Sequence, residues 1–167
     1  MIILGGGPAG CAASLRASQL GASPLIIEKT SFPRHKVCGE FLSPEVLPLL
    51  DSLGVERVFR ALSPAPMTRV ALHFGEREKR FALPEAAWGL SRYRLDDLLL
   101  SHALQAGATT AKTTNEAPVV VASGRHRQEP KGHRLFGFKA HFRGPANDAV
   151  ELYFFDGGYI GVNPVED

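Results

Sequence analysis

The first ten residues, Met1-Ile-Ile-Leu-Gly-Gly-Gly-Pro-Ala-Gly10, decide the fold of this chain. Residues 1–4 form a short apolar run that stops at glycines, which is typical of a buried strand in a parallel sheet. The six residues that follow match the pattern G-x-G-x-x-G. Small side chains within residues 11–17 favour a helix over 8–20 that lies close to the sheet. We therefore expect a strand, a tight glycine turn and a helix in direct succession.

A second apolar run, residues 24–28, completes a strand-helix-strand unit. In such a unit the first glycine permits the tight turn, the second lets a pyrophosphate approach the backbone, and the third allows close packing of helix on strand. The helix N-terminus adds amide donors and the positive end of a dipole. The residues to which this pattern assigns phosphate binding are Gly5, Gly7, Pro8, Ala9 and Gly10.

Glu28 stands at the end of the second strand, where an acid can accept hydrogen bonds from a ribose diol. The alternative is an acid that is merely solvated at a strand end. Because the strand, the loop, the helix and the acid are in register, the sequence predicts a dinucleotide site. The pattern alone does not choose between NAD and FAD.

The whole chain predicts an α/β fold, in which a three-layer, Rossmann-like domain is followed by the start of an antiparallel sheet. We expect helices over 43–54 and 95–106, a hairpin over 67–83 with its turn at 75–78, and a third buried strand over 119–122. In the C-terminal third, apolar residues alternate with polar or small ones, as in half-buried strands. The aromatic residues of this alternation, expected in a sheet core or else along an apolar substrate channel, are Phe136, Phe138 and Phe142.

The composition is that of an ordinary globular protein, with 44% hydrophobic residues, 22% charged residues and a formal net charge of +2. Basic residues are spread along the chain, which argues against nucleic acid as a partner. No apolar stretch approaches the roughly 18 residues of a membrane span. Two cysteines do not suggest a disulfide framework, so a cytoplasmic location is expected. The histidines show no metal-ligand spacing, and no metal site is expected.

Residues 5–13, 25–29 and 32–43 together resemble the N-terminal part of the geranylgeranyl reductase family, flavoproteins with the para-hydroxybenzoate hydroxylase type of fold. The most specific part is the stretch from Pro33 to Gly39, with the pattern P-x-x-K-x-C-G. The resemblance implies FAD as cofactor and NAD(P)H as a candidate electron donor. It also implies hydride transfer from the flavin to a carbon–carbon double bond of an isoprenoid-like or other apolar small molecule.

The resemblance assigns further side chains to the site. Residues 90–99 resemble the family segment R-x-x-x-D-x-x-L, whose arginine reaches the flavin cofactor, and Arg92 holds that position; the alternative is a solvated arginine at a helix start. Cys38 is placed beside the flavin or the substrate and is the candidate catalytic residue; otherwise it is a small buried hydrophobe. The residues added in this way to the cofactor site are Lys29, Arg34, Lys36, Cys38, Arg92 and Gly124.

We expect two domains. Residues 1–65 and 92–126 would form the FAD-binding domain, and residues 66–91 and 127–167 part of a substrate domain. Apolar strand faces left open by a partial domain would favour self-association.

Three features depart from the family pattern and keep alternatives open. Ser123 stands where related hydroxylases carry the aspartate of an Asp-Gly pair, residues 109–118 are shorter than the family's β-meander, and the chain stops at Asp167, before a Gly-Asp segment that contacts the cofactor. One alternative is an FAD-dependent monooxygenase or halogenase, although the halogenase motif Trp-x-Trp-x-Ile-Pro is missing and Trp88 is the single tryptophan. The other is a catalytically inert nucleotide-binding fragment.

Overall fold

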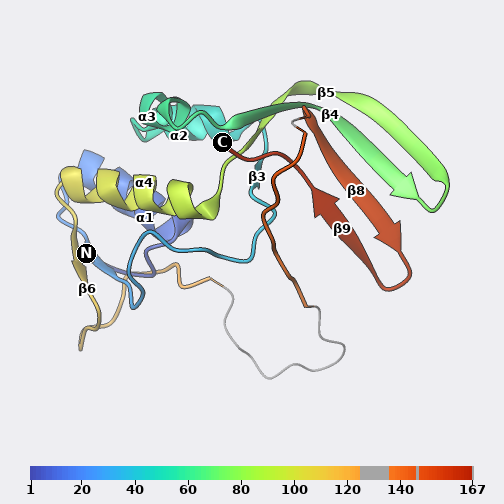
Figure 1. The fold of residues 1–167 in the computed structure, drawn as a ribbon. Coiled ribbons are helices and arrows are strands. Elements are labelled where there is room, and N and C mark those ends of the chain that lie inside the picture. The colour runs from blue at the N-terminus through green and yellow to red at the C-terminus, as the bar shows by residue number, and fades with distance from the viewer. Residues whose placement is uncertain (125–135, 146, 167) are drawn as a thin grey trace.

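The computed structural model describes residues 1–124, 136–145 and 147–166 (Figure 1). Its first sheet is parallel and has the strand order β6-β2-β1-β7. These strands are β1 (Ile2–Leu4), β2 (Leu25–Ile27), β6 (Thr109–Ala111) and β7 (Val120–Val121). Helix α1 (Pro8–Gln19) connects β1 to β2, so the strand-helix-strand unit expected from the first residues is present and the α/β class is confirmed.

The helices pack on this sheet around one apolar cluster. Figure 1 shows α1 beside α4 (Arg92–Gln105), with α2 (Val46–Ser52) and α3 (Glu56–Ala61) beyond them. The apolar face of α4 repeats every four residues, as the helical period requires. The cluster joins all these layers through Cys11, Leu15, Ile26, Leu50, Val55, Phe59, Leu90, Leu95, Leu99, Ala103 and Ala108. No helix in the described parts of the chain is long and apolar enough to span a membrane.

A second sheet has the strand order β3-β5-β4-β8-β9. Its strands are β3 (Phe41–Leu42), β4 (Ala65–Phe74), β5 (Arg77–Gly89), β8 (Ala149–Phe155) and β9 (Gly158–Val162). The expected hairpin is formed by β4 and β5, and Gly75 takes the left-handed φ of +61° at its turn. The expectation of purely antiparallel strands is wrong at one place, because β4 and β8 run parallel. These strands are joined by a long stretch of chain, which permits the parallel return.

Several predicted boundaries are also corrected. The helix expected over 43–54 begins later, at Val46, and it ends at Ser52, close to the expected end at Gly54, which takes a left-handed φ of +74°. The chain then forms α3, which buries Phe59 completely. Helix α4 begins at Arg92 rather than at residue 95, because Ser91 caps it by accepting a hydrogen bond from the Arg94 amide. The polar strand β6, which lacked an apolar pattern, arises from pairing with β2.

Two predictions of buried apolar residues are wrong. Phe136, Phe138 and Phe142 are 76%, 94% and 90% exposed, and residues 136–145 contain no regular secondary structure. No described strand pairs with residues 136–145, so their alternating apolar residues do not form part of a sheet. Strand β7 exists, but Val121 is 62% exposed because β7 lies at the sheet edge. The division into a FAD-binding and a substrate domain stays a prediction.

Candidate cofactor-binding site

The glycine loop between β1 and α1 is shaped by two close backbone approaches. Gly5 has a left-handed φ of +108°, and a Cβ atom there would lie 2.4 Å from the Ala122 carbonyl oxygen at the end of β7. A Cβ atom on Gly10 would lie 1.8 Å from the Gly5 carbonyl oxygen. Neither position can hold a side chain without moving the backbone. These glycines therefore bring the sheet, the loop and α1 together, as the motif requires.

Gly7 and the start of α1 offer a surface suited to an anion. A Cβ atom on Gly7 would meet only the Arg92 guanidinium, at 3.8 Å, so the backbone is open on this side and a cation stands next to it. Gly7 is the N-cap residue, has no side chain to satisfy the first amides, and no acid lies in the first turn. Pro8 occupies the position where a missing amide costs nothing, and Ala9 is exposed. The helix dipole thus meets no negative side chain of its own first turn.

Glu28 follows β2 and faces this loop. Its carboxylate accepts hydrogen bonds from the Gly6 amide at 3.0 Å, from the Thr30 amide at 2.9 Å and from the Thr30 hydroxyl, and Arg34 Nη2 lies 3.4 Å away. Burial by itself would raise the pKa of Glu28, but the bonds from Thr30 and Gly6 and the charge of Arg34 outweigh it and lower the pKa to about 2. Since a carboxylate accepts about four hydrogen bonds, a ribose diol has to replace one of these donors.

A cavity of about 240 Å³ opens beside Glu28. It lies between the loop after β2 and strand β6, and its floor includes Leu100 of α4. Phe32 and Ala111 give it apolar walls. Lys112 holds the two rims together by donating from Nζ to the Lys29 carbonyl oxygen at 3.1 Å, whereas the Lys29 residue itself is exposed. A flat apolar ring with a polar edge fits such a lining.

Behind the loop lies a buried carboxylate that holds two arginines. Asp96 is 0% exposed and receives two bonds from Arg92, from Nε at 2.5 Å and from Nη2 at 2.8 Å. Arg34 Nη1 lies 3.6 Å from the same carboxylate, and its guanidinium stacks over the Phe32 ring at 4.5 Å. Nε and Nη1 of Arg34 are buried and make no hydrogen bond to the described residues. The cluster therefore presents two ordered cations near Gly7 and Glu28.

The two cysteines differ in their surroundings. Cys11 is buried in α1, donates from Sγ to the Gly6 carbonyl oxygen at 3.2 Å, and has its pKa raised to about 12, chiefly by burial. Cys38 is only half-buried, and its Sγ accepts from the Glu40 amide at 3.4 Å and interacts with the Arg92 guanidinium. The structure thus brings Cys38 beside the arginine assigned to the cofactor site. Lys36 and Gly124 are exposed, and Gly124 ends the β7 region with a φ of +76°.

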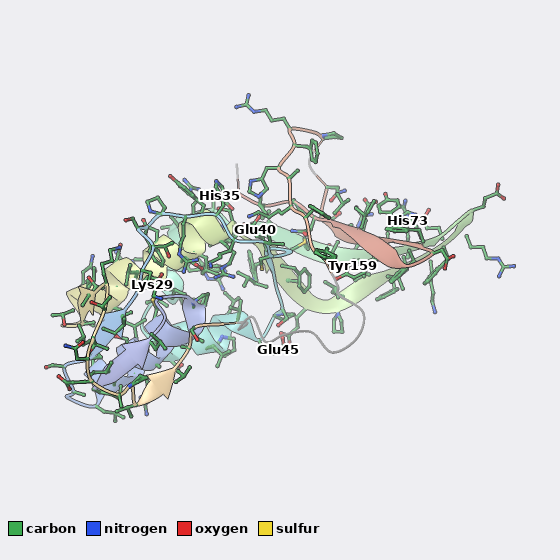
Figure 2. The ribbon with its side chains drawn as sticks, turned by 90° about the horizontal axis from the view of Figure 1, so that it is seen from below. Lys29, His35, Glu40, Glu45, His73 and Tyr159 are labelled. Atoms are coloured by element: carbon green, nitrogen blue, oxygen red, sulfur yellow. The ribbon has the colours of Figure 1, made fainter. Side chains whose placement is uncertain are left out.

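Glu40 is the functional candidate that the sequence reasoning missed. It is 3% exposed, and its carboxylate oxygens lie 2.6 Å from the Arg92 amide, from Lys139 Nζ and from His141 Nε2. Burial opposes ionisation, but the bonds from Lys139, His141 and the Arg92 amide outweigh it and lower the pKa of Glu40. Figure 2 shows Glu40 next to His35 at the junction between the two sheets. Its position directly after the Pro33 to Gly39 stretch was the signal that could have found it.

The residues before the chain end meet the start of α4, a contact that the sequence did not reveal. The Ser91 amide donates to Glu166 at 2.6 Å, and the Ser91 hydroxyl donates to the same carboxylate. A Cβ atom on Gly89 would lie 1.9 Å from the Pro164 carbonyl oxygen, so only glycine fits there. This contact ties the second sheet to the helix that carries Arg92.

The chain belongs to the family of FAD-binding domains, which matches residues 1–134. FAD is therefore the cofactor, and the chain is a member of the FAD-dependent oxidoreductase superfamily.

Among related proteins, the flavin-dependent halogenase armH4 of Armillaria mellea is 30% identical over 121 residues, which cover 65% of this chain and 22% of the halogenase. Menaquinone reductase of Mycobacterium tuberculosis is 31% identical over 111 residues, covering 65% of this chain and 27% of the reductase. The chain thus spans about a quarter of the length of these relatives.

Two solved structures extend the comparison. The flavin-dependent halogenase CmlS superposes with a TM-score of 0.60 at 30% identity, over 66% of this chain and 22% of that one. The myxobacterial chondrochloren halogenase CndH superposes with a TM-score of 0.75 over 99% of this chain and 50% of that one. At 20% identity the second likeness concerns the fold alone, and it includes both sheets.

Proposed function

We propose that the protein uses FAD to reduce a carbon–carbon double bond of an isoprenoid-like or other apolar substrate, as in the geranylgeranyl reductase family. The observation that carries the proposal is that Arg92 lies beside the open face of Gly7 and that Cys38 interacts with Arg92. Through Cys38, the Pro33 to Gly39 stretch reaches the arginine next to the proposed pyrophosphate-binding loop. The similarity to a menaquinone reductase supports an apolar, polyprenyl substrate.

The residues of the site fit the cofactor. Gly7 and the first amides of α1 would receive the pyrophosphate, with Arg92 as the neighbouring cation. Glu28 would accept from the ribose diol, and the cavity between Phe32 and Ala111 would receive the adenine. Arg34 adds a second cation near Glu28; its Nη1 is paired with Asp96 at 3.6 Å, and its buried Nε makes no hydrogen bond to the described residues.

Bound FAD supplies hydride transfer, while the protein binds it, orients it and excludes water. In this chain α1 and α4 bind the phosphates, and the ion pairs of Asp96 keep the two arginines in position. Cys38, half-buried between Arg92 and the Glu40 amide, would line the reacting face. NAD(P)H is the proposed electron donor.

A second candidate function is halogenation or monooxygenation, because the halogenases armH4 and CmlS are each 30% identical to this chain over the part that they match. Against it, Trp88 packs on the apolar cluster at the end of β5, with the Arg60 guanidinium 5.3 Å from its ring, and so is not free to line a site near β9. The third candidate is a catalytically inert nucleotide-binding fragment, which the flavin content of the purified chain tests.

Purification of the chain and a visible spectrum of any released ligand test the proposal. We expect a yellow protein with near-stoichiometric FAD, whose flavin NAD(P)H bleaches without oxygen and whose colour a menaquinone restores as the flavin hydride and a proton add across a double bond of its polyprenyl chain. Product analysis must then show a saturated bond in the polyprenyl chain. A chlorinated phenol formed with chloride and oxygen would favour the second candidate. A colourless chain that gains no flavin at micromolar FAD would support the inert one.

A further inference from the structure

Glu40 joins three parts of the chain that are distant in sequence. Its carboxylate is bound by the Arg92 amide, which opens α4, and by Lys139 and His141, which belong to residues 136–145. Its own amide reaches back to Cys38. Glu40 also holds a left-handed φ of +56°, a costly conformation for a glutamate. A costly backbone conformation at a buried acid whose carboxylate is hydrogen-bonded on both oxygens indicates that the position of Glu40 is important for the protein.

Residues 136–145 depend on this acid for their position. They contain no helix or strand, and Lys139 and His141 are the residues within this range whose side chains hydrogen-bond to the rest of the described chain. Gly137 lies against the Val37 side chain: a Cβ atom added at Gly137 would be 3.2 Å from Val37 Cγ1. The inward side of the segment therefore faces the Pro33 to Gly39 stretch and Glu40. The intervening phenylalanines are exposed on the outward side.

Glu40 is also connected to the proposed cofactor site, through Arg92. Its bond to the Arg92 amide fixes the first residue of α4, and the Arg92 guanidinium ends next to Gly7. Charged and titratable groups approach the carboxylate from each neighbouring part. They are Cys38 from its own loop, Arg92 from α4, and Lys139 with His141 from the segment, with His35 5.8 Å beyond the His141 ring and Tyr93 next to His35.

We propose that Glu40 is a positioning residue that couples occupancy of the cofactor site to ordering of residues 136–145. The coupling rests on the proposed function, because it requires FAD beside Gly7 and Arg92. FAD held by Arg92 steadies the start of α4, this steadies Glu40, and Glu40 in turn holds Lys139 and His141. The same coupling acts in reverse, since linkage between two sites is reciprocal. The ordered segment would then offer its apolar side to a substrate only when the cofactor is bound.

Hydrogen–deuterium exchange of the full chain, followed by mass spectrometry of peptides covering 136–145, tests the coupling. In the unchanged protein, FAD is expected to slow exchange of this segment. In Glu40→Gln, exchange without FAD should be faster by about tenfold, the factor expected for lost charge-assisted hydrogen bonds, and FAD should no longer slow it. Glu45→Gln is the matched control, because Glu45 is exposed and Figure 2 shows it away from Glu40. It should behave like the unchanged protein.

The double variant Lys139→Met/His141→Gln keeps the test decisive if Glu40→Gln does not fold, since it removes only the bonds on the segment side. It should lose the FAD effect while α4 stays protected, a separation that general destabilisation would not produce. FAD binding is measured in parallel by flavin fluorescence. If FAD binds to these variants and still slows hydrogen–deuterium exchange of residues 136–145, the coupling is wrong but the proposed function is not affected. A chain that does not bind FAD overturns the coupling and the proposed function together.

Discussion

The glycine loop and residues 136–145 both follow a clear sequence pattern, but only the first pattern led to the right structure. In the loop, Gly10 approaches the carbonyl oxygen of Gly5, five residues earlier, and Gly5 takes a left-handed φ that a local turn requires, although its Cβ position also meets the remote Ala122. In the second region, alternating phenylalanines needed a neighbouring strand, and the described chain provides none. Its position comes instead from one remote acid, Glu40. A pattern is thus reliable when its partners are local, and unreliable when the partner must be found elsewhere.

The largest effect is expected for Asp96→Ala, in the ion-pair cluster behind the loop. Without this carboxylate, Arg34 and Arg92 would be left as poorly compensated, largely buried cations. We expect a loss of about 3–5 kcal/mol in the free energy of unfolding, the range for breaking a buried ion pair. Urea unfolding measures it. A loss below about 1 kcal/mol would mean that solvent already compensates the arginines.

Gly10→Ala should come next, with a loss of about 3 kcal/mol, near the upper end for overpacking. The added Cβ atom would lie 1.8 Å from the Gly5 carbonyl oxygen, which is backbone and can yield only if the loop moves. FAD binding, followed by flavin fluorescence, should weaken with it. The matched control is Gly144→Ala, where no atom lies within 4 Å of the added Cβ atom and stability should be unchanged. If Gly10→Ala and Gly144→Ala had the same free energy of unfolding, Gly10 would not be as closely packed against the Gly5 carbonyl oxygen as the structure shows.

Glu28→Gln tests the acid of the loop through pH. Because the folded pKa of about 2 lies below the ordinary 4.5, ionised Glu28 stabilises the fold above about pH 4.5, and this contribution is lost as the pH falls towards 2. The variant should therefore be less stable than the unchanged protein at pH 7, with the difference shrinking below pH 4.5. FAD affinity should fall about tenfold, as for a lost hydrogen bond to a charged group. A difference that does not change with pH would refute the assigned bonds.

The smallest effect is expected in the second region. Phe138→Ser should change the free energy of unfolding by less than about 0.5 kcal/mol, because the side chain is 94% exposed. Thermal unfolding of the variant and of the unchanged protein provides the comparison. If the variant lost about 2 kcal/mol or more, the typical cost of emptying an apolar site, Phe138 would be packed and the contrast between the regions would disappear.

Much of the candidate site could be predicted because its residues belong to contiguous motifs. The glycine loop, Glu28 and the helix that carries Arg92 are close to where local rules placed them, since glycine conformation and strand burial act over a few residues. Glu40 could not be found in this way. It becomes a site residue only by receiving hydrogen bonds from Lys139 and His141, which are far away in sequence, whereas Asp96 stands in the segment R-x-x-x-D-x-x-L and pairs with Arg92 four residues earlier.

By itself, the sequence determined the first strand-helix-strand unit, because the left-handed turn at Gly5, the close approach of Gly10 to Gly5 and the apolar runs of β1 and β2 act over a few residues. It also determined the hairpin of β4 and β5, through a turn at Gly75. The tertiary structure alone decided that β8 returns parallel to β4, and that Glu40 would be the point where α4 and residues 136–145 meet. Both outcomes depend on which distant groups hydrogen-bond to a buried carboxylate or to the edge of a strand. A pattern within a few residues cannot predict those groups.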